Sequence, residues 1–287
     1  MTIPPAPVPL APARSPSIRF AGLALDRPRI MAIVNVTPDS FSDGGERLDP
    51  ARAVDDGLRF VSEGADIVDV GGESTRPGSR PVDADEELRR VLPVVEGLAR
   101  RDVAVSVDTR RAAVARACLD AGARVVNDVS ALQDDPALLP LVAGRGTPVV
   151  LMHRKGRAED KYVVPRYRDV VEEVRDFLVA RAEACCAAGV RAADIAIDPG
   201  LGFGKSVEEN LALVAGCRRL ADAGHPVLIG ASRKSFIGRL TGVEEARRRD
   251  PASIWLAVEA SRRGAVLLRV HDVAGTRQAL AVSQAMR

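Results

Sequence analysis

Eight short runs of apolar, largely β-branched residues recur along the chain, and each is followed by a segment with helical periodicity. Continuous apolar runs of this length are typical of parallel strands that are buried on both faces of a sheet. The runs are residues 30–34, 66–70, 103–107, 124–126, 148–152, 195–197, 227–229 and 266–270. This alternation constrains the fold strongly, because parallel strands need a crossover between them, which is usually a helix.

The segments between the runs carry helix signals at their starts. In the first segment, Asp49 and Pro50 precede a face formed by Ala51, Val54, Leu58 and Val61. In the sixth, Ser206 and Glu209 have the spacing of a capping box. The eight strand–helix units predict an α/β fold, a single (β/α)8 TIM barrel over residues 18–287. A doubly wound open sheet is the alternative, since strand order cannot be read from one sequence.

Composition narrows the class of protein further. The chain has 287 residues, 46% of them hydrophobic, and a net charge of +2, which favours neither a nucleic acid nor a membrane surface as a partner. Residues 1–17 contain six prolines and predict a short disordered Pro-rich arm rather than a secretory signal. The cysteines, with no zinc-ligand spacing, are expected to be buried, reduced thiols, which favours a cytoplasmic location: Cys118, Cys185, Cys186 and Cys217.

Polar or ionisable residues stand at or just after the end of every apolar run. In a (β/α)8 barrel, the carboxyl ends of the strands surround the active site. A polar strand end is ordinary by itself because strand ends often meet solvent, but eight coincident cases predict one functional site. The residues, in chain order, are Asn35; Glu73, Thr75 and Arg76; Asp108; Asn127 and Asp128; His153; Asp198; Ser232, Arg233, Lys234 and Ser235; Arg269 and His271.

The cationic members of this set predict an anion site. Arg269 and His271 are two residues apart on a strand, so their side chains point the same way. Together with Arg76 and Lys234 they could hold a multiply charged anion such as phosphate. The alternative for Arg269 is an ion pair with an aspartate at a strand end.

The two aspartates at strand ends predict recognition of a guanidine-like ligand edge. A carboxylate such as that of Asp108 or Asp198 can accept two parallel hydrogen bonds from such an edge. The alternative is a helix N-cap, since Thr109 and Pro199 follow directly. His153 is expected to be a packed, hydrogen-bonded residue rather than a ligand.

Two common kinds of site are not supported. The glycine-rich stretch 198–206 does not match a nucleotide phosphate loop, because Pro199 stands where that pattern needs glycine. The three histidines of the chain have no metal-ligand spacing, which argues against a catalytic zinc ion.

Several stretches of the chain resemble the dihydropteroate synthase family, and they occur in the same order as in that family. Each is weak alone, but together they are specific and extend over the chain from about residue 20. The matching stretches are NVTPDSFSDGG (35–45), DVGGESTRPG (69–78), SVDT (106–109), NDVS (127–130), LMH (151–153), DPGLGFGK (198–205), GASRKSFIG (230–238) and LRVHDV (268–273).

The resemblance implies a barrel that condenses 6-hydroxymethyl-7,8-dihydropterin pyrophosphate with 4-aminobenzoate in folate biosynthesis, releasing pyrophosphate with Mg²⁺. It also implies a homodimer and a sulfonamide target. The implied catalytic residues are Asp108, Lys234, Arg269 and His271. The implied pterin-binding set is Asp108, Asn127, Asp198 and Lys234. The implied pyrophosphate set is Asn35, Arg76, Arg269 and His271, with Asn35 also near Mg²⁺. The implied aminobenzoate pocket is Phe41, Thr75, Arg76, Pro77, Phe203 and Ser235.

The family mechanism implied here is dissociative: pyrophosphate departs first, and the arylamine then captures a cationic methylene-pterin. The chain departs from the family pattern after LMH, where residues 154–167 are rich in charge. Two other functions are therefore considered: a catalytically silent paralogue that only binds, and the pterin-binding domain of a corrinoid methyltransferase. The stretch Arg269-Val270-His271 argues against the methyltransferase domain, which lacks the leaving-group set.

Overall fold

The computed structural model describes residues 19–37, 49–73, 82–155 and 167–286. Its main sheet is parallel, and its strand order, β8-β7-β6-β5-β4-β3-β10-β9, follows the chain. The strands are β3 (Arg29–Asn35), β4 (Ile67–Gly71), β5 (Val105–Asp108), β6 (Val125–Asp128), β7 (Val149–Met152), β8 (Ile195–Asp198), β9 (Leu228–Ile229) and β10 (Leu267–Val270). All eight predicted strands are confirmed.

The sheet closes on itself between β8 and β9. Ile197 forms a parallel bridge with Val227, and the Ile197 N–H donates to the Pro226 carbonyl at 2.9 Å. An open, doubly wound sheet would instead reverse its strand order and keep two free edges. The (β/α)8 barrel prediction is therefore confirmed.

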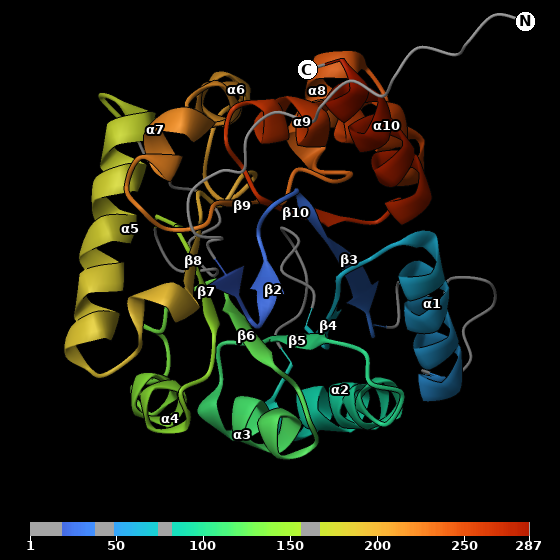
Figure 1. Ribbon diagram of the computed structural model, residues 1–287, viewed down its shortest axis with the longest axis vertical. Helices are drawn as coiled ribbons and strands as arrows, with labels where there is room; N and C mark the ends of the chain where they lie inside the picture. The colour runs from blue at the N-terminus through green and yellow to red at the C-terminus, as the bar shows by residue number, and fades with distance from the viewer. Residues whose placement is uncertain (1–18, 38–48, 74–81, 156–166, 287) are drawn as a thin grey trace, which may run out of the picture.

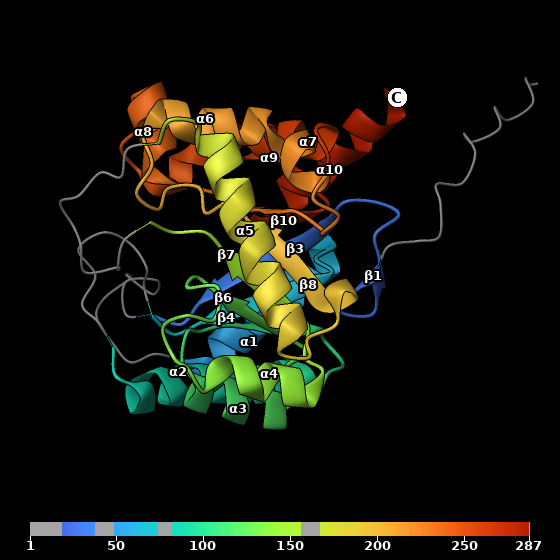
Figure 2. The same ribbon diagram turned by 90° about the vertical axis from the view of Figure 1, so that its left-hand side faces the viewer.

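Helices surround the barrel strands (Figure 1). After a 90° turn, α2, α3 and α4 lie on one side of the strands, and α6, α8 and α9 lie on the opposite side (Figure 2). The helices are α1 (Pro50–Glu63), α2 (Ala84–Ala99), α3 (Ala112–Asp120), α4 (Leu138–Arg145), α5 (Val170–Ala187), α6 (Val207–Ala215), α7 (Cys217–Ala221), α8 (Ser235–Thr241), α9 (Asp250–Arg262) and α10 (Val273–Ala285), with 3₁₀ turns η2 (Ala192–Asp194) and η3 (Ala246–Arg249).

The helix-start signals predicted from the sequence are present. The Asp49 side chain caps α1 by accepting from the Ala51 N–H. Ser206 and Glu209 form both hydrogen bonds of a capping box at the start of α6. These side chains satisfy backbone donors that have no partner within the first helical turn, so the sequence sets where these helices begin.

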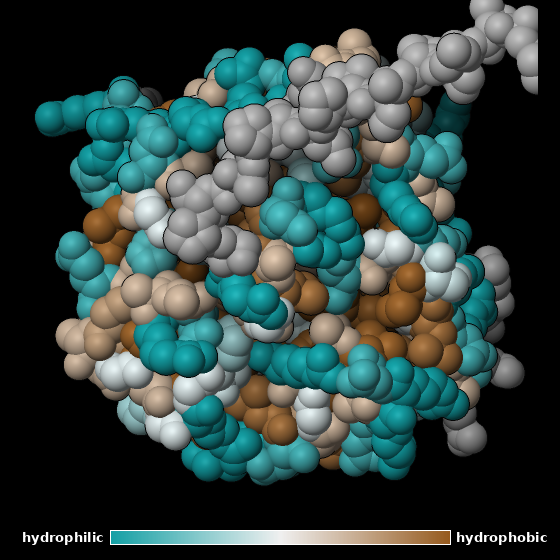
Figure 3. Space-filling view, in the orientation of Figure 1, coloured by the Kyte–Doolittle hydropathy of each residue, from teal (hydrophilic) through white to brown (hydrophobic). Residues whose placement is uncertain are grey.

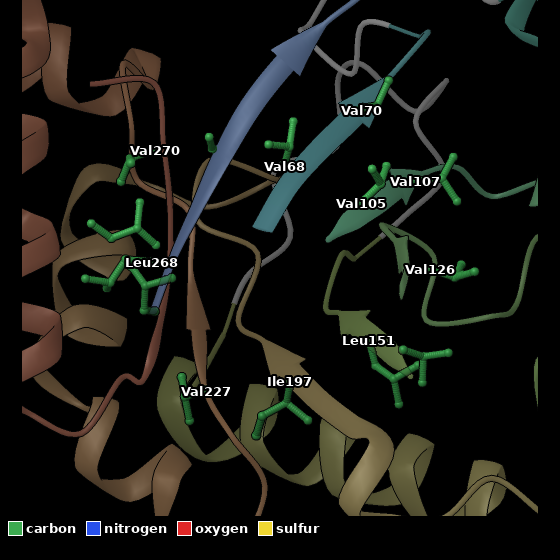
Figure 4. Packing of buried hydrophobic residues seen from close by; sticks show 14 of the residues in the cluster. Val68, Val70, Val105, Val107, Val126, Leu151, Ile197, Val227, Leu268 and Val270 are labelled. Carbon is green, nitrogen blue, oxygen red and sulfur yellow. The ribbon is translucent and has the colours of Figure 1, made fainter. Parts of the chain in front are cut away.

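The core has an outer and an inner part. Alternate strand residues such as Val68, Val107 and Leu268 face the helices and form the outer part (Figure 4). Residues in the intervening positions fill the barrel interior below the polar site and form its apolar floor: Met31, Ile67, Val125, Val150, Ala196, Leu228 and Leu267. Phe20 joins the inner part from a short antiparallel hairpin, β1 (Arg19–Phe20) and β2 (Leu23–Ala24). This hairpin was not predicted from the sequence.

Toward the carboxyl ends of the strands, the barrel interior becomes polar. The period of two places Asp69 beyond Ile67 on β4 and Arg269 beyond Leu267 on β10. Asp108 pairs in register with Asn127 on the neighbouring strand. A charged layer thus lies directly above the apolar floor, so the strands themselves position the candidate site.

The surface and the cysteines complete the description. Hydrophilic residues cover most of the face shown in Figure 3, with smaller hydrophobic areas between them. No helix in the described ranges is long and apolar enough to cross a membrane. All four cysteines are free, but Cys186 is exposed, which corrects the expectation that all four are buried. The predicted arm, residues 1–17, lies outside the described residues.

Candidate active site

Arg269 is the centre of a charged cluster in the barrel interior. Its Nε donates to Asp69 Oδ2 at 2.6 Å, and its Nη2 donates to Asp108 Oδ2 at 2.7 Å. Asn127 Nδ2 donates to the same Asp69 oxygen at 3.0 Å. The alternative interpretation of Arg269, an ion pair with a strand-end aspartate, is therefore confirmed, and its proposed anion-binding role has to coexist with that pair.

Burial and charge set the protonation of this cluster. Burial raises the pKa of Asp108 to about 7; Arg269 opposes this rise, and the Asp69 carboxylate adds to it. Although burial alone would lower it, the ion pairs with Asp69 and Asp108 raise the pKa of Arg269 above its ordinary value. Arg269 is thus a permanent cation, while Asp108 changes its charge near neutral pH.

Asp198 and Lys234 form a second pair in the same interior. Asp198 Oδ1 accepts from the Gly200 N–H at 2.7 Å, so Asp198 caps the rim loop rather than a helix. Burial raises the pKa of Asp198, and the nearby charge of Lys234 opposes this rise. Burial lowers the pKa of Lys234 to about 8. Lys234 Nζ also donates to the Leu201 carbonyl and lies over the Phe203 ring, 4.4 Å from its centroid.

A cavity is lined mainly by α1 and by residues 245–250, and it reaches the carboxyl ends of β3 and β10. Asn35 and His271 both line it, and its volume is about 570 Å³. The imidazole Nδ1 of His271 lies 2.9 Å from Ser232 Oγ, which fixes the ring direction. Arg233 also lines this cavity, while it forms a two-point ion pair with Asp250 at 2.7 Å. Two members of the predicted pyrophosphate set thus share one cavity.

The predicted aminobenzoate pocket is described only in part. Phe41, Thr75, Arg76 and Pro77 lie outside the described residues. Phe203 is half-buried beside Lys234. Ser235 is the first residue of α8 and is exposed. The composition of this pocket stays a prediction.

Two residues from the strand ends have structural roles. The Asp128 carboxylate accepts from the Ser130 hydroxyl and from the N–H groups of Ser130 and Leu132, each at 2.7 Å, so it shapes its own loop. His153 is buried and packs edge-on against Phe177, with ring centroids 4.9 Å apart. Burial lowers the pKa of His153 to about 3, so the ring is neutral. The prediction that His153 is packed is confirmed, but its Nδ1 is buried without a hydrogen-bond partner among the described residues, which corrects the prediction that the ring is hydrogen-bonded.

Two residues of the site were not predicted from the sequence. Asp69 lies inside the apolar run DIVDV, and only residues after that run were predicted as site residues. Lys205 is buried, and its Nζ donates to the carbonyls of Gly200, Phe203 and His153 at 2.9, 3.2 and 3.4 Å. Burial lowers the pKa of Lys205 to about 7. The strand period would have placed Asp69 on the inner face, and Lys205 stood in the matched stretch DPGLGFGK without an assigned role.

The segment that departs from the family pattern is anchored at both described ends. Arg154 forms an ion pair with Asp134, and Lys155 Nζ lies 3.4 Å from Glu173 Oε2. Lys155 Nζ also lies 4.4 Å from the centroid of the Tyr167 ring. Residues 156–166 lie outside the described residues. The charges of Arg154 and Lys155, both at the first described end, therefore join this end to Asp134 and to Glu173 on α5.

Known proteins match this chain over most of its length. The family model described as "Pterin binding enzyme" matches residues 31–271. The dihydropteroate synthase of Mycobacterium leprae is 50% identical over 88% of this chain and 92% of its own. That of Escherichia coli is 43% identical over 92% of this chain and 93% of its own.

Solved structures give the same result. The Xanthomonas albilineans dihydropteroate synthase with 4-aminobenzoic acid is 51% identical, with a TM-score of 0.89, and the match covers 94% of this chain and 98% of that one. The same enzyme in complex with 7,8-dihydropteroate is 49% identical, with a TM-score of 0.85 and the same coverage. The chain therefore belongs to the pterin-binding enzymes and, within them, to the dihydropteroate synthase family.

Proposed function

We propose that this chain is a dihydropteroate synthase that condenses 6-hydroxymethyl-7,8-dihydropterin pyrophosphate with 4-aminobenzoate, giving 7,8-dihydropteroate and pyrophosphate in folate biosynthesis. The single observation that carries the proposal is the polar layer inside the barrel, where Asp108, Asn127, Asp198 and Lys234 gather around Arg269. A buried layer of this kind has no role in packing a barrel, which apolar side chains fill better.

The pterin would bind in this layer. Its amide and amino groups present two adjacent N–H donors, which match the two acceptors of the Asp198 carboxylate. Asp198 retains acceptor capacity after it binds the Gly200 N–H, because a carboxylate has about four lone-pair sites. Lys234 lies beside Asp198 and can donate to the pterin carbonyl. These contacts would hold the methylene carbon toward the mouth of the barrel.

The pyrophosphate would leave toward the carboxyl ends of β3 and β10, where this cavity begins. Asn35 and His271 line this cavity, and Arg269 lies on the same strand face as His271. When the C–O bond to pyrophosphate breaks, these groups would stabilise the departing anion, and the Asp108 carboxylate would stabilise the cationic methylene-pterin. The arylamine nitrogen would then form the new C–N bond and lose a proton. No covalent bond to the protein is needed.

Mg²⁺ is proposed as a companion of pyrophosphate rather than as a resident ion. The described part of the chain contains no cluster of three or more His, Cys, Asp or Glu side chains able to hold a metal. Mg²⁺ commonly takes one or two protein oxygen ligands together with phosphate oxygens and water, and the Asn35 carbonyl fits this pattern. When bound, the ion would neutralise charge on the leaving group.

The function is tested by product identification. The purified protein is incubated with both substrates and Mg²⁺, and mass spectrometry follows 7,8-dihydropteroate. We expect product at a catalytic turnover, and no product when either substrate is omitted. Pterin binding without product would identify the chain as a silent binding paralogue. Sulfonamides should compete with 4-aminobenzoate, as proposed from the solved Yersinia pestis dihydropteroate synthase with a sulfonamide drug.

We also propose a homodimer that uses the outer faces of α8, α9 and α10. Trp255, Leu240 and Val282 are large apolar side chains with exposed fractions of 62%, 55% and 62%. Clusters of exposed aromatic and aliphatic side chains favour association. Light scattering after gel filtration should give twice the chain mass, and Trp255→Arg should give the monomer. The matched control is Val61→Arg on α1; a monomeric wild type would refute the proposal. The cytoplasmic location stays a prediction.

A further inference from the structure

Asp69 is a fully buried charged residue in the barrel interior. It lies in the middle of β4, its exposed fraction is 0%, and its neighbours Val68 and Val70 face the helices. Ile67, two residues earlier, belongs to the apolar floor. An isolated buried carboxylate is costly, and an apolar side chain would fill this position more stably. We therefore expect Asp69 to have a role other than packing.

One oxygen of Asp69 joins two members of the proposed pterin site. Asp69 Oδ2 accepts from Arg269 Nε at 2.6 Å and from Asn127 Nδ2 at 3.0 Å. The other oxygen, Oδ1, is buried and has no hydrogen-bond partner among the described residues. The carboxylate thus links β4 to β6 and to β10. Neither of these strands is next to β4 in the sheet.

We propose that Asp69 is a positioning residue for the pterin site, where its carboxylate fixes the direction of the Asn127 amide and of the Arg269 guanidinium. This inference rests on the proposed function. Asp69 would not touch the substrate; it would act through the two residues that it holds.

The Asn127 contact decides which group the amide presents to the ligand. Because Nδ2 of Asn127 is committed to Asp69, its carbonyl oxygen points away from Asp69. Asn127 therefore offers an acceptor, which suits the N–H donors of a pterin ring. Without Asp69, the amide could turn and offer a donor against a donor.

The Arg269 contact decides how the guanidinium is shared. Nε is bound by Asp69 and Nη2 by Asp108, which together fix the plane of the group. A guanidinium has five N–H donors, so this fixed plane leaves further donors for a ligand. Because two carboxylates share one cation, Asp69 also weakens the hold of Arg269 on Asp108.

Because Asp69 and Asp108 share Arg269, the charge of Asp69 affects the pKa of Asp108. The charged groups around Asp108 come from several elements: Arg269 on β10, Asp69 on β4, Glu87 on α2, Asp128 on β6 and Lys234 before α8. Removing the negative charge of Asp69 leaves Arg269 to neutralise Asp108 alone. The pKa of Asp108 should then fall, by on the order of one unit for a close like charge.

The test uses equilibrium binding rather than turnover. Binding of 6-hydroxymethylpterin, which carries no phosphate, is measured by calorimetry from pH 5 to pH 9 for the wild type, Asp69→Asn and Asp69→Ala. The matched control is Ser106→Ala, because Ser106 is also fully buried, faces Asp69 in register and has an unpartnered hydroxyl among the described residues.

Asp69→Asn keeps an acceptor for both donors but removes the charge. Pterin affinity should change with pH as Asp108 titrates. We expect the midpoint of this change to lie on the order of one pH unit lower in Asp69→Asn than in the wild type. Asp69→Ala should weaken binding about tenfold at every pH, the size of one misplaced hydrogen bond. Ser106→Ala should match the wild type in midpoint and affinity. If Asp69→Ala does not fold, the midpoint of Asp69→Asn still decides.

Two failures can be told apart. If the wild type binds the pterin and Asp69→Asn shows the wild-type midpoint and affinity, the positioning role is wrong while the proposed function stands. If the wild type binds the pterin but forms no product, the synthase activity is wrong, and the midpoint shift still tests Asp69. If the wild type binds no pterin, the proposed function and the inference are both wrong.

Discussion

At the scale of single residues, the interior charges are arranged for a ligand more than for stability. Asp198 is expected to accept two N–H groups of the pterin. Asp198→Asn replaces one acceptor with a donor, which should lower kcat/KM by on the order of a hundredfold. The melting temperature should change little, because the residue lies at the mouth of the barrel. Steady-state kinetics and thermal unfolding check both expectations.

The control for this variant is Asp134→Asn. Asp134 is also a rim carboxylate, but it pairs with Arg110 and Arg154 outside the barrel interior. Its replacement should leave kcat/KM within a few fold of the wild type. Near-normal kinetics of Asp198→Asn would remove Asp198 from the site.

Asp108 predicts a dependence of stability on pH. Its pKa rises from 3.8 to about 7 on folding, mainly through burial. Between these values the folded state binds a proton that the unfolded state has lost, so this stabilisation is complete below pH 3.8 and disappears as the pH rises through about 7. Asp108→Asn cannot titrate, so it should gain stability relative to the wild type as the pH increases from 5 to 8.

Urea unfolding at several pH values measures this difference. Glu87, Asp128 and Asp198 also have raised pKa values, but they are present in both proteins. The comparison therefore isolates Asp108. A constant difference in unfolding free energy from pH 5 to pH 8 would contradict the shifted pKa.

Some of these residues could be predicted from the sequence, and others could not. Asp108, Asn127 and Asp198 were visible because each follows an apolar run, and Arg269 was visible because it pairs with His271 at the end of its run. Asp69 was concealed because a single charge among valines, in DIVDV, leaves the strand pattern intact. The sharing of Arg269 between two carboxylates could not be predicted, because it joins positions 200 and 161 residues apart.

At the scale of elements, the rim loop after β8 is held by contacts that tolerate no added atom. Gly200 has φ +67°, and a Cβ there would lie 1.9 Å from the His153 carbonyl oxygen. Gly200→Ala should therefore displace the loop, weaken pterin binding and destabilise the protein by several kcal/mol. Calorimetry with a pterin and urea unfolding measure the two effects.

Gly224→Ala is the matched control for backbone conformation. Gly224 has φ +88°, but a Cβ there meets nothing within 4 Å. Its replacement should cost about 1 kcal/mol, the strain of a left-handed residue alone. Equal losses for the two variants would mean that the contact with His153 does not restrain the loop.

Two helix starts were predicted from the sequence as well as the eight strands. Asp49 and Ser206 mark helix starts by local hydrogen bonds, and local signals survive in any fold. The hairpin β1–β2 was missed because its strands have two residues each, too short for any periodic pattern. Its place is set by the barrel floor that it covers.

At the scale of the whole molecule, the closed barrel separates stability from function. The floor, which includes Phe20 at 1% exposure, is an apolar layer below the charged layer. Phe20→Ala should cost about 3–5 kcal/mol of unfolding free energy through the cavity that it leaves. The folded variant should keep the wild-type kcat/KM at low temperature.

Urea unfolding and kinetics on the same preparation check this separation. Val61→Ala, on the exposed side of α1, is the control and should change stability by less than about 0.5 kcal/mol. A large loss of kcat/KM in folded Phe20→Ala would show that the floor and the site are coupled. The eight strand–helix units were predictable from the apolar runs. The strand order and the closure depend on long-range pairing, such as the bridge between Ile197 and Val227, that no local pattern reveals.

The most direct test of the whole account is the release of inorganic pyrophosphate by the wild-type protein, measured against the concentration of 4-aminobenzoate with saturating dihydropterin pyrophosphate and Mg²⁺. We predict release that saturates with 4-aminobenzoate, with one pyrophosphate for each 7,8-dihydropteroate formed. Release that is absent, or that does not depend on 4-aminobenzoate, would contradict the claim that the charged layer of this barrel joins these two substrates.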